Sequence, residues 1–454
     1  MYFVCFAVNN FPVPDIPKTM RAVVYRGVND LRLETVPVPR IGANELLVKV
    51  AVCGVCPTDI KKIQHGTVAP PRIFGHETAG TIVKLGGGAS VLASRNGGRP
   101  LGLGDRVALH HHVPCGDCHY CRHRAFAQCD QYKRTGITAG FEPAGGGYAQ
   151  YVRVMPFVLP GVVKIPAKNS FAEGAMLEPV NTILKAVKRL NLMPGDAVLV
   201  AGQGPIGLMF TKILQLRGMR VLATDLLESR LKLAKKFGAK WISLARQMGE
   251  SGSAGAEPGE RKPVSLSAAG GGEGRGEVAS QLSTINHQLD SAIIAVPSDD
   301  AVTQAFQLVR GGGQILLFAH TKRAAPIKNS AFSLQPSAFS LQPSAFSPQP
   351  SAFSPQPSAF SLQPSALSPQ PSAFSLQPSA FSLDPSTICV DEKDLIGSYS
   401  SDWTLQAEVA RLVFSRRLDV RQLITHTFPL EQTAAAIALA AKPTGASLKI
   451  IVAA

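Results

Sequence analysis

Two groups of residues have the types and the spacing that a bound metal ion requires. In the first group, Cys56 stands twenty residues before the adjacent pair His76–Glu77, and Cys53 lies close upstream. A thiolate, an imidazole and a carboxylate are ligand types that zinc accepts in an open catalytic site. Cys53 and Cys56 compete for the role of sulfur ligand on this evidence alone. The pattern predicts a catalytic metal centre on this stretch.

The second group is a run of four cysteines with the spacing C-x2-C-x2-C-x7-C, namely Cys115, Cys118, Cys121 and Cys129. Four thiolates on one short loop form a closed tetrahedral zinc site. Such a site has no open position, so its role is in folding and not in chemistry. An iron–sulfur cluster is the alternative use of this spacing. The neighbouring tract 110–112 is all histidine, but consecutive side chains on a strand point to opposite faces, so we predict no metal there.

The segments Cys-Gly-Val-Cys-Pro-Thr-Asp and Gly-His-Glu around the first group carry a family resemblance. They resemble the zinc-dependent, alcohol dehydrogenase-like medium-chain dehydrogenase/reductase family, in its polyol and threonine dehydrogenase branch. The resemblance runs from about Met20 to the C-terminus, apart from two insertions. It implies that Cys56 is the sulfur ligand beside His76 and Glu77, and that Cys53 is a small buried residue. It also implies a structural zinc lobe at the four clustered cysteines.

The same resemblance implies roles for residues around the metal. The Thr58 hydroxyl would pass the substrate proton onward, and Asp59 would hold a ligand or a loop amide from behind. Glu178 is a candidate fourth zinc ligand or a partner of the zinc-bound water, so either Glu77 or Glu178 would bind the metal directly. Family members often carry a histidine five residues after the ligand cysteine, whereas this chain has Lys61 there.

A glycine-rich turn predicts a dinucleotide site in the second half of the chain. Gly202, Gly204 and Gly207 fit G-x-G-x-x-G, enclose Pro205 and Ile206, follow the apolar stretch 197–201 and open a helical pattern. The first glycine permits the tight turn, the second lets backbone approach a pyrophosphate, and the third lets helix and strand pack closely. The pyrophosphate would then lie at the N-terminus of the helix.

The choice of cofactor depends on the end of the next predicted strand. Asp225 stands eighteen residues after Gly207, where a carboxylate accepts hydrogen bonds from ribose hydroxyls and repels a 2′-phosphate. We therefore predict NAD over NADP, although Arg230 nearby favours NADP unless it stacks on adenine or pairs with Glu228. The resemblance further places the nicotinamide near Ala295, Val296 and Phe318.

These residues need two kinds of domain to position them. Alternating apolar and polar residues over 20–55 predict short strands. The resemblance implies an α/β fold, with a doubly wound Rossmann domain and a discontinuous β-rich GroES-like catalytic domain. We place an N-terminal extension at 1–19, catalytic segments at 20–180 and 401–454, and the NAD-binding domain at 181–400.

Two insertions interrupt the nucleotide-binding half. Residues 249–280 are rich in Gly, Ser, Ala and Glu without apolar periodicity, which predicts a flexible surface insertion. Residues 330–385 repeat a heptad of the form SAFSLQP. Because a proline in every repeat is incompatible with a continuous helix, the tract predicts a disordered or polyproline-like tether and no coiled coil.

Composition narrows the functional class. The chain has 454 residues, 45% of them hydrophobic, and a net charge of +15, but its basic residues are scattered and predict no nucleic-acid partner. Clustered cysteines in a long enzyme-like chain indicate metal and a reducing cytoplasm. No apolar run approaches the length of a membrane span. We also expect no signal peptide and a homodimer or homotetramer.

Together these observations predict a zinc- and NAD-dependent oxidoreductase that moves hydride between a secondary, polyol-like alcohol and the nicotinamide ring. Two alternatives stay open. One is an NADP-dependent zinc alcohol or aldehyde reductase. The other is a non-catalytic nucleotide-binding or assembly protein that uses the Phe- and Pro-rich repeat tract as its interaction element.

Overall fold

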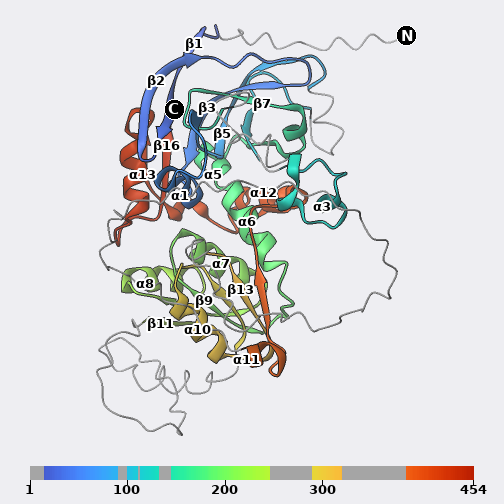
Figure 1. Ribbon diagram of the computed structural model, residues 1–454, viewed down its shortest axis with the longest axis vertical. Coiled ribbons are helices and arrows are strands. Elements are labelled where there is room, and N and C mark those ends of the chain that lie inside the picture. Colours follow the sequence, from blue (N-terminus) through green and yellow to red (C-terminus); the bar gives the residue numbers. More distant parts are fainter. Residues whose placement is uncertain (1–14, 90–99, 111–112, 132–144, 246–288, 320–384) are drawn as a thin grey trace, which may run out of the picture. The chain divides into compact units, whose positions relative to one another are not determined.

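The computed structural model describes residues 15–89, 100–110, 113–131, 145–245, 289–319 and 385–454 (Figure 1). The predicted insertion at 249–280 lies outside these residues, as do 330–384 of the repeat tract and most of the N-terminal extension. Within the described ranges, no helix has the length and apolar character that crossing a membrane requires.

Six parallel strands form the sheet of the nucleotide-binding half, in the order β11-β10-β9-β12-β13-β14. Numbered along the chain this order is 3-2-1-4-5-6, which is that of a dinucleotide-binding doubly wound sheet, so the predicted fold class is confirmed. The strands are β9 (Ala197–Ala201), β10 (Arg220–Asp225), β11 (Trp241–Leu244), β12 (Leu289–Ile294), β13 (Val309–Leu317) and β14 (Asp394–Gly397).

Helices between these strands pack against them. Helix α7 (Pro205–Leu216) contacts β9 and β10, α8 (Glu228–Lys236) contacts β10 and β11, and α10 (Asp299–Leu308) contacts β12 and β13. Every residue of β9 is buried, as expected for a central strand with both faces covered. The glycines at 311–313 lie within β13, which shifts its register against β12 around Gly312 at φ +67°.

β13 and β14 are parallel neighbours although the chain between them is long. Leu317 at the end of β13 pairs with Gly397, and Gln314 pairs with Asp394. The repeat tract falls within this connection. The edge strand β14 has no second neighbour among the described strands.

Two further sheets form the β-rich part (Figure 1). One is a three-stranded sheet in the order β2-β1-β4, and the other runs β15-β16-β3-β5-β6-β8, with β7 also paired to β3. Chain segments from both ends meet here, because β16 from the C-terminal segment pairs with β3. The strands are β1 (Thr19–Gly27), β2 (Asp30–Pro37), β3 (Leu46–Gly54), β4 (Arg72–Ile73), β5 (Glu77–Leu85), β6 (Arg106–Ala108), β7 (Tyr151–Val154), β8 (Val163–Lys164), β15 (Ile424–Pro429) and β16 (Lys449–Ala453).

Short helices complete this part. Helix α1 (Pro57–His65) follows β3, and α5 (Phe171–Ala175) begins with a capping box between Ser170 and Glu173. Helix α6 (Leu177–Val187) follows α5 in the chain. A 3-10 turn at Trp403–Leu405 leads into α12 (Gln406–Phe414). The remaining helices of this part are α3 (His119–Arg122) and α13 (Thr433–Ala441), whereas α11 (Pro385–Cys389) precedes β14 of the nucleotide-binding sheet.

Candidate metal and cofactor sites

The ends of two paired strands position the first metal group. β3 and β5 run antiparallel, with Gly54 opposite Glu77 at the start of β5. Cys56 follows β3 directly and is the N-cap of α1, where its Sγ accepts the backbone N–H of Thr58 at 3.5 Å. A helix N-terminus favours negative charge, so this position suits a thiolate.

The structure brings Cys56, His76 and Glu77 together. Their ligand atoms all lie within 4.8 Å of one another, and the two side chains on the β5 side are buried. A Cβ on Gly54 would lie 1.9 Å from Glu77 Oε2, so the glycine leaves room for this carboxylate. Sulfur, imidazole and carboxylate together are a donor set that zinc accepts.

A buried carboxylate fixes the orientation of His76. Asp59 Oδ1 lies 3.1 Å from His76 Nδ1, so Nε2 is the ring nitrogen that would bind a metal. Burial alone would lower the pKa of His76, but the charges of Asp59 and Cys56 raise it well above the ordinary value. Asp59 is itself fully buried, and its second oxygen accepts the Tyr148 hydroxyl. Cys53, also fully buried, has its thiol pKa raised to about 12 by desolvation, as suits a residue outside the ligand set.

Lys449 contacts the same site from the opposite end of the sequence. Its Nζ donates to Glu77 Oε1 at 2.6 Å and to the Val55 carbonyl at 2.9 Å, and it also forms an ion pair with Glu77 Oε2. The Lys449 ammonium therefore contacts both oxygens of the Glu77 carboxylate. Burial would lower the pKa of Lys449, but the Glu77 carboxylate raises it.

Glu178, on the first turn of α6, stands apart from this ligand set. Its carboxylate is buried but does not belong to the cluster of ligand atoms that Cys56, His76 and Glu77 form. Burial raises the pKa of Glu178 to about 7, with His76 opposing and Glu77 adding to the shift. The structure therefore places Glu178 within electrostatic reach of the site, as a neighbour of the ligands.

The four clustered cysteines also meet. The Sγ atoms of Cys118 and Cys121 are 3.5 Å apart, and those of Cys115 and Cys121 are 3.9 Å apart. Tetrahedral zinc with bonds of about 2.3 Å would separate its sulfurs by about 3.8 Å, so the spacing fits a tetrathiolate. Backbone amides of Asp117 and Cys118 lower the pKa of Cys115 to about 7, which favours the thiolate that a metal needs.

The glycine turn after β9 has the close contacts that its sequence predicts. Gly202 has φ +90°, and Gly204 is the N-cap of α7, with Pro205 and Ile206 in the first turn. A Cβ on Gly207 would lie 1.7 Å from the Gly202 carbonyl oxygen, so no other residue fits without moving the backbone. The N-terminus of α7 thus lies at the carboxyl end of β9, where a pyrophosphate binds in this fold.

The carboxylate of Asp225 is held at the end of β10. Its Oδ2 accepts the Gln203 N–H at 2.6 Å, and its Oδ1 accepts the Leu227 N–H at 2.9 Å. Each oxygen has a second lone pair that a ribose hydroxyl could use. Arg230 Nη1 lies 3.9 Å from Asp225 Oδ2, so the arginine faces this carboxylate.

The other three expected cofactor residues lie beside the same turn or at the same strand ends. Ala295 N donates to the Ala201 carbonyl, and a Cβ on Gly202 would lie 2.2 Å from Val296 Cγ1. Phe318 follows β13 and packs edge-on against Phe210 of α7.

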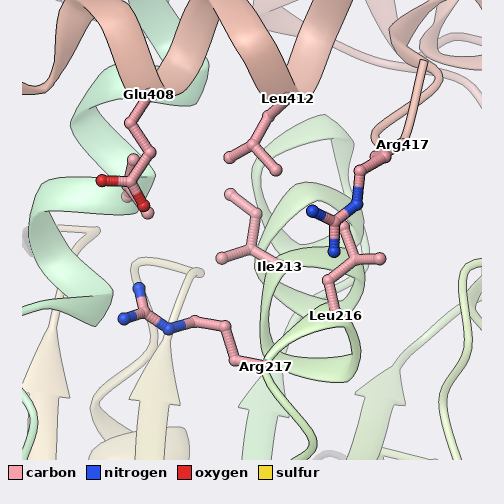
Figure 2. A pocket seen from close by; sticks show the side chains of 7 residues that line it. Ile213, Leu216, Arg217, Glu408, Leu412 and Arg417 are labelled. Carbon is pink, nitrogen blue, oxygen red and sulfur yellow. The ribbon is translucent and has the colours of Figure 1, made fainter. Parts of the chain in front are cut away.

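A separate pocket of about 230 Å³ lies among α6, α7 and α12 (Figure 2). Figure 2 shows Ile213 and Leu412 pointing toward each other, with the charged side chains of Glu408, Arg217 and Arg417 on either side of them. None of the expected site residues lines it. The lining residues are Leu184, Ile213, Leu216, Arg217, Glu408, Leu412 and Arg417.

Comparison with known families agrees with this geometry. Residues 42–167 match the alcohol dehydrogenase GroES-like domain, and residues 205–346 match the zinc-binding dehydrogenase model. The chain belongs to the zinc-dependent medium-chain dehydrogenase/reductase family. The family and the two kinds of domain expected from sequence are thereby confirmed.

Among curated relatives, the chain is 32% identical to a sorbitol dehydrogenase of Bacillus subtilis, over 51% of this chain and 63% of that protein. It is 30% identical to D-xylulose reductase A of Aspergillus oryzae, over 50% of this chain and 61% of that protein. The matched segments thus span about three fifths of these relatives.

Solved structures of the same fold include 2R,3R-butanediol dehydrogenase of Bacillus subtilis, with a TM-score of 0.64 and 20% identity over 96% of this chain and 99% of that one. Acetophenone reductase of Geotrichum candidum in complex with NAD has a TM-score of 0.65 and 20% identity, over 97% and 98% of the two chains.

Three residues around the candidate metal centre could not be predicted from the sequence. Lys449 begins an apolar strand that lies 372 residues from Glu77, and a charged residue at that position is the one local signal. Tyr148 stands in a glycine-rich stretch whose pairing with the segment before His76 is not readable from spacing. Gly54 follows an alternating strand, and its role depends on the register between β3 and β5.

Proposed function

We propose that this chain is a zinc-dependent oxidoreductase that transfers hydride between a secondary, polyol-like alcohol and NAD. The observation that carries the proposal is the convergence of Cys56, His76 and Glu77 in a chain that also folds a glycine turn for a dinucleotide. The names of the relatives, sorbitol dehydrogenase and D-xylulose reductase A, favour polyols as the substrate class.

Each residue around the metal position has a defined task in this proposal. Cys56 and His76 would hold zinc, with Glu77 ligating directly or from behind, and bound zinc would polarise the substrate oxygen as a Lewis acid. Asp59 keeps the His76 ring oriented. Thr58, half-buried two residues after Cys56, would accept the substrate hydroxyl proton and pass it outward. Glu178 would support the ligands as a buried neighbour.

The cofactor would lie along the carboxyl ends of the parallel strands. The Gly202–Gly207 turn would receive the pyrophosphate, and Ala295, Val296 and Phe318 would border the nicotinamide, which accepts the hydride. We propose NAD over NADP because the carboxylate of Asp225 is fixed by two backbone amides where a 2′-phosphate would have to lie.

One assay tests the reaction and one variant tests the cofactor choice. A panel of polyols and simple secondary alcohols with NAD, followed at the NADH absorbance, should give turnover in protein that carries two zinc ions per chain. Inactivity toward the whole panel at full zinc content would refute the proposal. Asp225→Ser should lower kcat/KM for NAD and raise it for NADP. An unchanged ratio would remove Asp225 from cofactor selection.

We also propose that the enzyme is a cytoplasmic homodimer or homotetramer. The seven cysteines in the described ranges are all free thiols, which suits a reducing compartment. The edge strand β14 and its flanks expose Val390, Leu395 and Tyr399, and an exposed apolar strand edge favours pairing with another chain. Sedimentation of the wild type and of Leu395→Lys tests this, and a monomeric wild type would contradict it.

A further inference from the structure

Tyr148 is a buried polar side chain that no part of the proposed reaction uses. It is 1% exposed and lies before β7. Its N–H donates to the Phe74 carbonyl at 3.0 Å, and its own carbonyl accepts the Val23 N–H at 2.8 Å. The preceding Gly147 N–H donates to the Gly75 carbonyl at 2.8 Å. The backbone of Tyr148 is therefore tied to the two residues that come just before His76.

The hydroxyl of Tyr148 reaches the carboxylate behind His76. It lies 3.3 Å from Asp59 Oδ2 and 3.3 Å from the Gly54 carbonyl oxygen. With one hydrogen and two acceptors at equal distance, the ionised carboxylate is the stronger acceptor. Burial and the nearby Asp59 charge raise the pKa of Tyr148 well above its usual value, so the hydroxyl keeps its proton and remains a donor.

The two oxygens of Asp59 thus have different partners. Oδ1 lies against His76 Nδ1, while Oδ2 faces Tyr148, the hydrogen-bond donor to that oxygen within the described residues. Asp59 is fully buried, so water cannot replace a lost donor easily. If Oδ2 loses its partner, the carboxylate gains freedom to rotate, and the His76 ring loses its fixed orientation.

We propose that Tyr148 is a positioning residue of the metal centre, which acts through Asp59 to hold the His76 ring with Nε2 toward the metal. This inference rests on the proposed zinc site. It places Tyr148 behind Asp59, which itself lies behind the ligand His76. Because the backbone of Tyr148 is hydrogen-bonded to the segment before His76, the Tyr148 hydroxyl and the His76 ring keep fixed positions relative to each other.

The test is the zinc affinity of Tyr148→Phe, measured by competition with a chromophoric chelator and without any assay of turnover. Because the chain has two candidate zinc centres, the competition curve has two phases. The phase that is absent from the curve of Cys56→Ser belongs to this centre. Loss of a partner behind a metal-bound histidine typically costs 10- to 100-fold in affinity, and we expect roughly 10-fold because Tyr148 acts through Asp59. Cobalt loaded into this centre should show shifted visible absorption bands in the variant.

Tyr25→Phe is the matched control. Tyr25 is also 1% exposed and packs on Phe74, in the same apolar cluster as Tyr148, but has no hydrogen bond to the metal residues. It should leave zinc affinity and the cobalt spectrum unchanged.

A second comparison places the effect on the pathway through Asp59. In an Asp59→Asn background, Tyr148→Phe should cost less than 2-fold, since the carboxylate that it holds is gone. Wild-type affinity in Tyr148→Phe, or the same 10-fold loss with and without Asp59, would overturn the inference. Zinc that binds normally in an inactive protein would refute the proposed reaction and leave this inference standing.

Discussion

The ion pair between Lys449 and Glu77 gives the sharpest prediction about stability. The two side chains are 7% and 2% exposed, and the Lys449 ammonium contacts both carboxylate oxygens. Lys449→Met keeps the volume and the apolar stem but leaves the Glu77 charge buried without its cation. Removing one partner of a buried pair costs about 3–5 kcal/mol, whereas an exposed pair contributes about 0–1 kcal/mol. The loss is a large share of the roughly 5–15 kcal/mol that stabilises a typical protein.

Urea unfolding of Lys449→Met, with zinc content measured in every sample, should show this loss. Lys393→Met is the matched control, because Lys393 is equally buried but its carboxylate partner Asp391 is 46% exposed. We expect about 1–2 kcal/mol there. If Lys449→Met costs no more than Lys393→Met, the reasoning about the buried charge fails.

Two further predictions concern the glycine turn at the cofactor site and the free energy of unfolding at acid pH. Gly207→Ala should abolish NAD binding in a titration of NADH fluorescence, because its Cβ would lie 1.7 Å from the Gly202 carbonyl; binding within 2-fold of wild type would contradict this. Hydrogen bonds from Arg416 and from the Ser170 and Asn169 groups outweigh burial and lower the pKa of Glu173. A lowered folded pKa gives stability that is complete above the unfolded value and is lost as pH falls through the folded one. Glu173→Gln should therefore lower the free energy of unfolding by about 1–3 kcal/mol at pH 7, and by progressively less below about pH 4. Urea unfolding at each pH measures this loss. A loss that does not depend on pH would refute the prediction.

The nucleotide-binding half is where sequence reasoning reaches furthest. The turn at Gly202–Gly207 and the strand end at Asp225 follow from local rules, since a tight turn and close helix packing each demand glycine at a fixed spacing. Local rules alone do not place the glycines at 311–313, which the structure accommodates within β13 by a change of register against β12. Register is set by pairing with β12, which a single segment does not encode.

The metal centre shows the opposite limit. Cys56, His76 and Glu77 are readable because their types and spacing have few other uses. Lys449 and Tyr148 are not readable, since each reaches the site through strand pairing between distant segments, β16 with β3 and the stretch before β7 with the residues preceding β5. Burial makes these two residues important, and burial is a property of the assembled sheets.

The adjacency of β13 and β14 has a consequence for how this gene can vary. Their pairing closes a connection of 76 residues, from 318 to 393, that contains the heptads. For an unstructured tether of the kind that the sequence predicts, closure entropy grows only with the logarithm of length, so gaining or losing one heptad changes the free energy of folding by about 0.1 kcal/mol. Copy number of the repeat can therefore drift between alleles almost without thermodynamic selection from the sheet that it joins.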